Sequence, residues 1–426
     1  MTQRTLFTEE PSFVDRSTKS VTFQGKMNLP IHRWYRLTPS FSPQLAYDIS
    51  DSFKLTEKDF VLDPFSGVGT VPLCMKYRKI PACSVELNPY LHFVGTVKTR
   101  DYTDLAEIEE TFMKFSADLN RELRRLPKDA ESYLKEHQYD IPGISNPDRW
   151  WSPGNMMQLV CLRKFIHTFE AHVHHKNLLM MAVLGILIPV SNAKHNHVSL
   201  TFAEKPLQTV DIGVVMVNKL CEMLEDLHSM KGIPRSDVVV HRGNSKFLTS
   251  VLPASPKVSA VITSPPYPNR FSYARETRPH LFFFNFVPDA KSVGEIETDA
   301  IGGTWGKATS VLMAGVDPIN DIVGNALAPF VEGVPEADTG GLMRSYVVKY
   351  FNNLYEHAAE ISKVCRSGAK LAYVIGNSKF YDHPLPSDEI LAKIFEGFGF
   401  ETTSIDRMRK RQSKSGLYEA VVFMQR

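Results

Sequence analysis

The stretch Phe60-Val61-Leu62-Asp63-Pro64-Phe65-Ser66-Gly67-Val68-Gly69-Thr70 decides the fold of this chain. It begins as an apolar run typical of a buried strand, and it passes through a glycine turn into a helix-like segment from Val71 to Tyr77. Glycines let a backbone approach a ligand closely, and the start of a helix favours a carboxylate or phosphate. The spacing of its glycines differs from the G-x-G-x-x-G pattern of dinucleotide-binding loops. The stretch therefore predicts a strand, a ligand-binding loop and a helix in succession.

A second short strand is predicted at Ala82–Val85, and it ends in Glu86. An acid about 20 residues after a glycine loop is suited to hydrogen-bond a ribose. Strand and helix patterns then alternate to about Val97, which is typical of a doubly wound α/β sheet.

The tetrapeptide Ser264-Pro265-Pro266-Tyr267 is the other informative stretch, and it follows the apolar run Val258–Thr263. Two prolines must end a strand, because proline removes a ladder donor and restricts the residue before it. The result is a rigid loop at the carboxyl end of a strand, where open α/β sheets bind ligands. Its hydroxyl, carbonyls and aromatic ring suit a planar exocyclic amino group. A proline-rich turn without a ligand is the alternative, because a short motif alone is a hypothesis.

Together these stretches resemble the S-adenosylmethionine-dependent DNA amino-methyltransferases, over roughly residues 28–100 and 236–426. The glycine loop resembles their cofactor motif, Glu86-Leu87-Asn88-Pro89 their second-strand acid, and His241-Arg242-Gly243-Asn244-Ser245 the third-strand end that contacts adenine. Asn244 stands where the family often has Asp. The resemblance implies these residues for binding S-adenosyl-L-methionine: Asp63, Pro64, Phe65, Gly67, Gly69, Thr70, Glu86, Asn88, Asn244 and Ser245.

The resemblance also implies methyl transfer to the exocyclic amino group of a base flipped out of double-stranded DNA. It makes Ser264, Pro265, Pro266 and Tyr267 the catalytic residues. Tyr267 would stack on the base, while the Ser264 hydroxyl and the Pro265 carbonyl accept the amino hydrogens. In the family, Ser at the first motif position goes mostly with cytosine N4, so cytosine N4 is favoured over adenine N6. The alternatives are an RNA or protein amide methyltransferase and a non-catalytic S-adenosylmethionine-binding regulator.

The expected fold class is α/β, a Rossmann-like class I methyltransferase sheet with helices on both faces plus a helical inserted domain. Residues 1–27 are expected to form an N-terminal arm. Residues 28–100 and 236–426 are expected to form the S-adenosylmethionine-binding catalytic domain, and residues 101–235 a helical insertion that is the candidate target-recognition domain. Within the catalytic domain, residues 287–341 are expected to form a glycine-rich insertion or flap.

Each of three shorter segments is compatible with two interpretations. Residues 28–58 either pack over the methionine end of the cofactor, as the resemblance implies, or lead structurally into the first strand. The polar cluster Ser191–His197 is a DNA-reading loop or a solvated loop. The pair Trp150-Trp151 stacks on bases or, as is commoner for buried aromatics, braces a helix.

The basic run Arg407–Ser415 is expected to form a hairpin loop that contacts DNA phosphates or is simply solvated. The candidate DNA-binding residues are Asn192, Lys194, Asn196, Arg270, Arg407, Arg409 and Arg411.

Composition limits the partners and the compartment. The 426 residues carry a net charge of only +2, so contact with DNA must come from local patches. The five cysteines form no C-x-x-C pair, and His195 and His197 lack the spacing of helical ligands, so no metal is expected. The chain starts without the apolar core of a signal peptide and has no run long enough for a bilayer, so a cytoplasmic protein without membrane contact is expected. A cognate restriction endonuclease, acting separately, is a further candidate partner.

Overall fold

The computed structural model describes residues 29–35, 37, 42–194, 201–202, 208–303, 307–334, 340–410 and 416–426. The predicted N-terminal arm, Asn196 and Arg411 lie outside the described residues, and Arg409 is described by its backbone alone.

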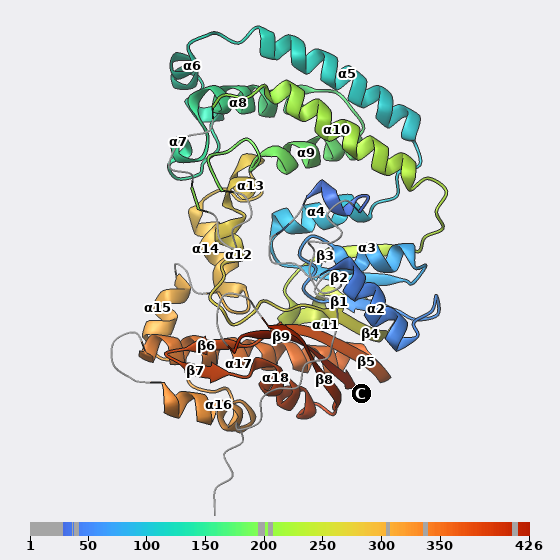
Figure 1. The fold of residues 1–426 in the computed structure, drawn as a ribbon, viewed down its shortest axis with the longest axis vertical. Helices are drawn as coiled ribbons and strands as arrows, with labels where there is room; N and C mark the ends of the chain where they lie inside the picture. Colours follow the sequence, from blue (N-terminus) through green and yellow to red (C-terminus); the bar gives the residue numbers. More distant parts are fainter. Residues whose placement is uncertain are drawn as a thin grey trace, which may run out of the picture.

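A seven-stranded sheet forms the centre of the larger part of the molecule (Figure 1). Its strands, in spatial order, are β3 (Val238–Arg242), β2 (Ala82–Glu86), β1 (Val61–Asp63), β4 (Val258–Thr263), β5 (Cys365–Gly376), β9 (Tyr418–Gln425) and β8 (Glu401–Lys410). The first five are parallel, and β9 is antiparallel to both of its neighbours. A two-stranded ribbon, β6 (Ser378–Phe380) with β7 (His383–Leu385), lies outside this sheet.

The chain reverses its direction of travel across the sheet between β1 and β4. It passes from β1 outward to β2 and β3, and it then returns to the other side of β1 as β4. In open α/β sheets such a reversal opens a crevice at the carboxyl ends of the two strands, where ligands bind. The predicted α/β fold class is confirmed, because the sheet is mostly parallel and consistent with a class I methyltransferase fold.

Helices cover both faces of the sheet. On one face, α2 (Pro43–Phe53) and α3 (Thr70–Tyr77) share a core with Val61 and Ala260. On the other face, α17 (Gly340–Val364) and α18 (Ser387–Glu396) share a core with Leu62 and Val261. Adjacent residues of one strand serve opposite cores because successive side chains of a strand point to opposite faces.

A group of helices between β2 and β3 forms the other end of the molecule (Figure 1). Its members are α5 (Leu105–Arg124), α6 (Ala130–Glu136), η3 (Gln138–Asp140), α7 (Pro147–Trp150), α8 (Pro153–Thr168), α9 (Val173–Ile186) and α10 (Ile212–Ser229). These helices pack on α4 (Pro89–Thr99), which follows β2 and shares their hydrophobic core. The described residues between Leu105 and Ser229 are thus mainly helical, which agrees with the helical character expected of residues 101–235.

The described parts of residues 287–341, which were expected to form a glycine-rich insertion or flap, are largely helical. They contain α14 (Ala290–Asp299), α15 (Lys307–Met313) and α16 (Asp321–Gly333). The Thr304–Gly306 part of the glycine-rich segment lies outside the described residues. Four further short helices are η4 (Ser245–Phe247), α11 (Leu248–Val251), α12 (Tyr273–Glu276) and α13 (Arg278–Phe283).

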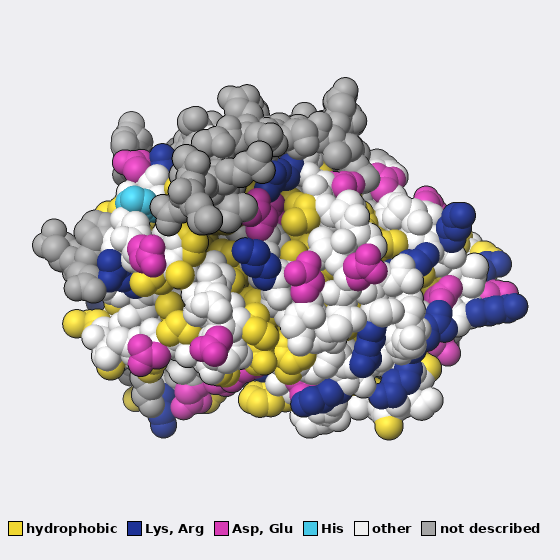
Figure 2. Space-filling model, turned by 90° about the horizontal axis from the view of Figure 1, so that it is seen from below, with side chains coloured by type: hydrophobic (Ala, Val, Ile, Leu, Met, Phe, Trp, Pro, Cys, Tyr) yellow, Lys and Arg dark blue, Asp and Glu magenta, His cyan; other side chains and the backbone are white. Residues whose placement is uncertain are grey.

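The visible surface agrees with the small net charge. Figure 2 shows one face, seen from below the view of Figure 1, on which basic side chains are interspersed with acidic and hydrophobic ones. Among the helices that the structure describes, none is both long enough and apolar enough to cross a membrane.

Candidate functional site

A pocket at the carboxyl ends of β1 and β4 brings together most of the predicted site. Nine of the ten predicted cofactor residues line it, namely Asp63, Pro64, Phe65, Gly67, Thr70, Glu86, Asn88, Asn244 and Ser245. Ser264 and Pro266 of the predicted catalytic loop line the same pocket, whereas Gly69, Pro265 and Tyr267 do not. Residues from four separate strand ends thus meet at the point where the strand order reverses.

Asp63 joins the glycine loop to the strand that carries Ser264. Its Oδ1 accepts a hydrogen bond from Thr263 Oγ1 at 2.6 Å and another from Phe65 N at 3.1 Å. Burial raises the pKa of Asp63 to about 7, although both hydrogen bonds oppose that rise. The side chain therefore fixes the turn after β1 and sets its position relative to β4.

Glu86 holds the glycine loop from the end of β2. Its Oε2 accepts a hydrogen bond from Gly67 N at 2.7 Å, and its Oε1 accepts one from Asn88 N at 2.8 Å. Burial raises the pKa of Glu86 to about 7 against these two hydrogen bonds. A carboxylate oxygen can accept a second hydrogen bond, so Glu86 can hold the loop and a ribose hydroxyl together.

The two glycines of the loop have different tasks. Both have positive φ, +53° at Gly67 and +79° at Gly69, a conformation that side chains disfavour. A Cβ built on Gly67 would meet no atom within 4 Å, so this residue borders open space in the pocket. A Cβ on Gly69 would lie 3.0 Å from the Cα of Gly95 in α4. Gly69 is therefore required by the close approach of two backbones.

The end of β3 supplies the wall where the resemblance places adenine. Asn244 accepts a hydrogen bond from Lys246 N at 3.0 Å and donates one to the carbonyl of Asp299 at 3.2 Å. The ring of Phe65 lies 4.8 Å from that of His357, a buried residue of α17. This wall is held by contacts to α14 and α17.

Two tyrosines of α17 that were not identified from the sequence contact the segment from Ser264 to Arg270. Tyr350 Oη donates a hydrogen bond to the Pro266 carbonyl at 2.7 Å. Tyr346 Oη accepts one from Arg270 N at 3.1 Å. Their spacing of four residues in a helix-like stretch is the available signal, because it places both rings on one face.

A wall of the pocket comes from α14 and the residues after it. Ile296, Glu297, Asp299, Ala300, Ile301 and Gly303 line the pocket. The carboxylate of Glu297 is buried and accepts a hydrogen bond from Ser272 Oγ at 2.8 Å. The predicted flap region therefore borders the site, and it contributes an acid that the sequence analysis did not select.

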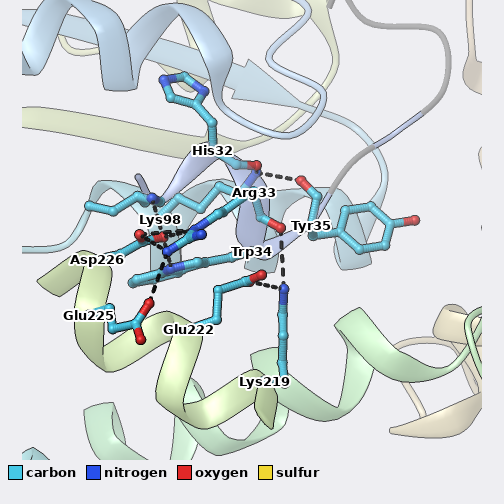
Figure 3. Close-up of polar contacts among 10 residues, drawn as sticks. His32, Arg33, Trp34, Tyr35, Lys98, Lys219, Glu222, Glu225 and Asp226 are labelled. Atoms are coloured by element: carbon cyan, nitrogen blue, oxygen red, sulfur yellow. Dashed lines mark hydrogen bonds and ion pairs between the residues drawn. The ribbon is translucent and has the colours of Figure 1, made fainter. Parts of the chain in front are cut away.

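The segment before the glycine loop is clamped to the helical insertion (Figure 3). Within it, η2 (His32–Trp34) lies against α10, where the carboxylate of Asp226 accepts hydrogen bonds from Ile31 N at 2.8 Å and Trp34 Nε1 at 3.0 Å. The guanidinium of Arg33 pairs with the same carboxylate at 2.7 Å. One buried acid thus binds three groups of this segment.

Lys98 of α4 holds the other side of the same segment (Figure 3). Its Nζ donates hydrogen bonds to the carbonyls of Tyr35 at 2.6 Å and His32 at 3.2 Å. Burial lowers the pKa of Lys98 to about 7. Leu37, two residues after Tyr35, lines the pocket. The segment therefore both leads into the fold and contributes to the pocket wall.

The predicted polar cluster after α9 divides into buried and exposed residues. Asn192 is buried, and its backbone N–H and side-chain amide donate to the carbonyls of Trp150 at 2.7 Å and Arg149 at 3.2 Å. Lys194 is exposed. Trp150 and Trp151 are both buried, and Trp151 Nε1 donates to the Leu187 carbonyl at 3.0 Å, which confirms the bracing interpretation.

The basic run that begins at Arg407 was expected to form a hairpin loop, but its first residues belong to a strand. Strand β8 extends through Lys410, so Arg407 and Arg409 lie in a strand, and the prediction of a loop from Arg407 onward was wrong. Arg407 forms ion pairs with Asp388 at 3.1 Å and Glu389 at 2.7 Å, both in α18. Arg270 of the catalytic loop region is exposed and has a positive φ of +60°.

Comparison with known proteins adds an independent line of support. The chain is 23% identical over 460 aligned residues to the type II methyltransferase M.BsoBI of Geobacillus stearothermophilus, and the match covers 93% of this chain and 84% of the relative. It is 21% identical over 427 residues to the type II methyltransferase M.AvaI of a Nostoc strain, with coverage of 91% and 83%. No protein-family model matches the chain. Similarity to type II methyltransferases, at low identity but over nearly the whole chain, supports the methyltransferase family for this protein.

Proposed function

We propose that this protein is a site-specific DNA methyltransferase that uses S-adenosyl-L-methionine and modifies the exocyclic amino group of a flipped base, with cytosine N4 favoured. One observation carries the proposal. Nine of the ten residues predicted to bind the cofactor line one pocket together with Ser264 and Pro266 of the predicted catalytic loop. Similarity to type II methyltransferases supports the reaction class, and site-specific methylation of double-stranded DNA is the activity that best fits such relatives.

Three features of the pocket support S-adenosyl-L-methionine as the cofactor. Open space beside Gly67 allows close approach to its backbone, and Glu86 offers a carboxylate for ribose hydroxyls. The Phe65 ring provides an apolar surface for a flat base. When bound, S-adenosyl-L-methionine would supply an electrophilic methyl group. The residues that would hold it are those of the glycine loop, Glu86 and the end of β3.

Ser264 is the residue proposed to act on the base. It follows β4 directly, and β4 is tied to β1 through the Thr263–Asp63 hydrogen bond, so its hydroxyl is held beside the glycine loop. The hydroxyl would accept one hydrogen of the amino group. The Pro265 carbonyl would accept the other, which requires a rearrangement of the loop because Pro265 does not line the pocket in this structure. The lone pair of the nitrogen is then less conjugated with the ring, which makes the nitrogen more nucleophilic. Positioning and fixed dipoles supply most of the acceleration in such a mechanism.

The base must leave the duplex before its amino group can reach this loop. Tyr267 is proposed to stack on it, although in this structure Tyr267 packs against the core that contains α17 and does not line the pocket. Stacking would therefore require its ring to turn toward the pocket. Adenine N6 of DNA, a base of RNA and an amide of protein are the alternative acceptors.

The test uses the full chain with methyl-labelled S-adenosylmethionine and duplex DNA, RNA or protein in parallel. The expected product is labelled duplex DNA that yields N4-methylcytosine on digestion to nucleosides. Ser264→Ala should lower kcat strongly and leave cofactor affinity unchanged, whereas Ser404→Ala, an exposed serine of β8, should behave like the unaltered chain. Full turnover by Ser264→Ala would refute the catalytic role of Ser264. Methyl label found only in RNA or protein would refute DNA as the substrate.

A further inference from the structure

Three metal-binding side chains meet at the start of the helical insertion, away from the pocket. Asp104 directly precedes α5, and His174 and His175 lie in the first turn of α9. The Nε2 atoms of His174 and His175 lie 2.6 and 2.8 Å from one oxygen, Asp104 Oδ2. All three donor atoms lie within 4.8 Å of one another. Two imidazole nitrogens and a carboxylate oxygen therefore converge on one point.

The carboxylate of Asp104 contacts the two histidines and does not cap its own helix. It occupies the N-cap position of α5, where an Asp side chain usually accepts a hydrogen bond from the first turn of the helix. No such bond is formed by the Asp104 side chain. The carboxylate is used to join α5 to α9.

The other ring nitrogen of His175 is arranged as in a metal ligand. His175 Nδ1 lies 2.9 Å from Thr111 Oγ1, and that hydroxyl donates to the carbonyl of Glu107 at 2.8 Å. A hydroxyl has a single hydrogen, so in this arrangement it accepts the Nδ1 hydrogen of His175. This contact holds the His175 ring in the orientation that points Nε2 at Asp104. Metal-binding histidines commonly donate their second N–H to an oxygen in this way.

The cluster is buried on the side of His175 and open to solvent on the side of His174 and Asp104. The side chain of His175 is only 1% exposed. His174 and Asp104 are about one-quarter exposed, so an ion can reach the cluster from solvent.

We propose that Asp104, His174 and His175 bind a Zn²⁺ ion that fastens the start of α5 to the start of α9. Imidazole and carboxylate ligands suit zinc, and water would take the fourth tetrahedral position. Zinc bonds of about 2.0 Å place donor atoms about 3.3 Å apart, so the side chains would separate by roughly half an ångström to admit the ion. No metal was expected from the sequence, because the cysteines form no C-x-x-C pair and His195 and His197 lack the spacing of helical ligands. Asp104 is 70 positions from His174, so no local pattern joins these ligands.

The test is titration of the full chain, without a histidine tag and after removal of metals, with Zn²⁺ alone. Calorimetry should show one ion per chain, and Co²⁺ in place of zinc should give the intense visible absorption of a tetrahedral site. Chelator should lower the Tm of the zinc-loaded protein. These readouts are independent of methyl transfer, so they separate this proposal from the proposed function.

Variants define the ligand set. His174→Ala should weaken zinc binding at least about 100-fold, and Thr111→Val should weaken it about 10- to 100-fold by releasing the His175 ring. His172→Ala is the matched control, because His172 is exposed and its ring centre lies 5.4 Å from that of His175. Circular dichroism checks the fold of each variant. Absence of stoichiometric zinc binding to the unaltered chain, or equal loss in His172→Ala and His174→Ala, would overturn the assignment.

Discussion

Asp226 Oδ2 accepts a hydrogen bond from Trp34 Nε1 at 3.0 Å, although the two residues are 192 positions apart. The carboxylate belongs to the helical insertion, and the indole belongs to the segment that leads to the glycine loop. Both side chains are buried. The insertion is thus joined to the surroundings of the pocket by a specific polar contact as well as by apolar packing.

Asp226→Ala should therefore destabilise the protein by about 3–5 kcal/mol, because it leaves buried donors of Ile31 and Trp34 and the Arg33 cation without their acceptor. Chemical denaturation measures this difference. Glu225→Ala is the control, since Glu225 is exposed and lies 3.6 Å from the same arginine, and it should change stability by less than about 1 kcal/mol. Equal effects of the two substitutions would contradict this account of the clamp.

Glu86 should make the stability of the cofactor-free protein depend on pH. Burial raises its pKa from an ordinary 4.5 to about 7, so the folded protein retains a proton that the unfolded chain has already lost between these values. The stabilising contribution is full below about pH 4.5 and is lost as the pH rises through about 7. Thermal unfolding across pH 4–8 should show a smaller decline for Glu86→Gln than for the unaltered chain. An unchanged pH profile would contradict the raised pKa, and Glu401→Gln on β8 is the exposed control.

The two loop glycines should fail in different ways when replaced. Gly67→Val should weaken S-adenosylmethionine binding by about 1–3 kcal/mol, because a branched side chain enters the open pocket. Gly69→Ala should mainly lower stability, by about 1–2 kcal/mol for the left-handed backbone and more for its approach to Gly95. Calorimetric titration and thermal unfolding of both variants separate the effects. The assignment of roles fails if Gly67→Val binds the cofactor normally.

Tyr350→Phe should lower kcat more than it weakens cofactor binding. The substitution removes the hydroxyl that holds the Pro266 carbonyl, and an unsatisfied carbonyl costs about 1–3 kcal/mol. The loop that carries Ser264 would then be held less firmly. Tyr355→Phe, on the same helix and packed on Phe398, provides the control. Single-turnover methylation distinguishes this effect from slower product release.

Substitutions of Lys194 and Asn192 should affect different properties, namely DNA affinity and protein stability. Lys194→Ala should reduce DNA affinity, because one phosphate contact is lost. The slope of the logarithm of the binding constant against the logarithm of the salt concentration should become shallower by about 0.9. Asn192→Ala should instead lower stability, because its buried amide bonds the carbonyl before Trp150. Measurement of DNA affinity at several salt concentrations decides the matter, and an unchanged slope in Lys194→Ala would remove this residue from the interface.

Local patterns predicted the parts of the site that follow strand ends. The glycine loop, Glu86 and Ser264 each lie directly after an apolar run, so their convergence in one pocket follows from the parallel arrangement of the strands. Tyr350 and Glu297 were missed because their importance depends on which helix packs against the loop. That packing is a tertiary property without a local sequence signal.

The same limit explains the errors at the end of the chain. The charged residues Arg407–Lys410 suggested a solvated loop, but antiparallel pairing with β9 extends the strand through them. Arg407 is accommodated there because α18 presents Asp388 and Glu389 to it. A basic residue therefore becomes part of a strand through partners that lie 18 and 19 positions away.

The strand order also has a consequence during protein synthesis. Strand β8 precedes β9 in the chain, yet it reaches the sheet only through β9, which lies between it and β5. While the ribosome has made β8 but not β9, β8 has no place in the sheet and β5 presents an unpaired edge. Such edges are prone to pair with other chains. Chains that end before Tyr418 should therefore aggregate more readily than the full chain, in which β9 covers this edge.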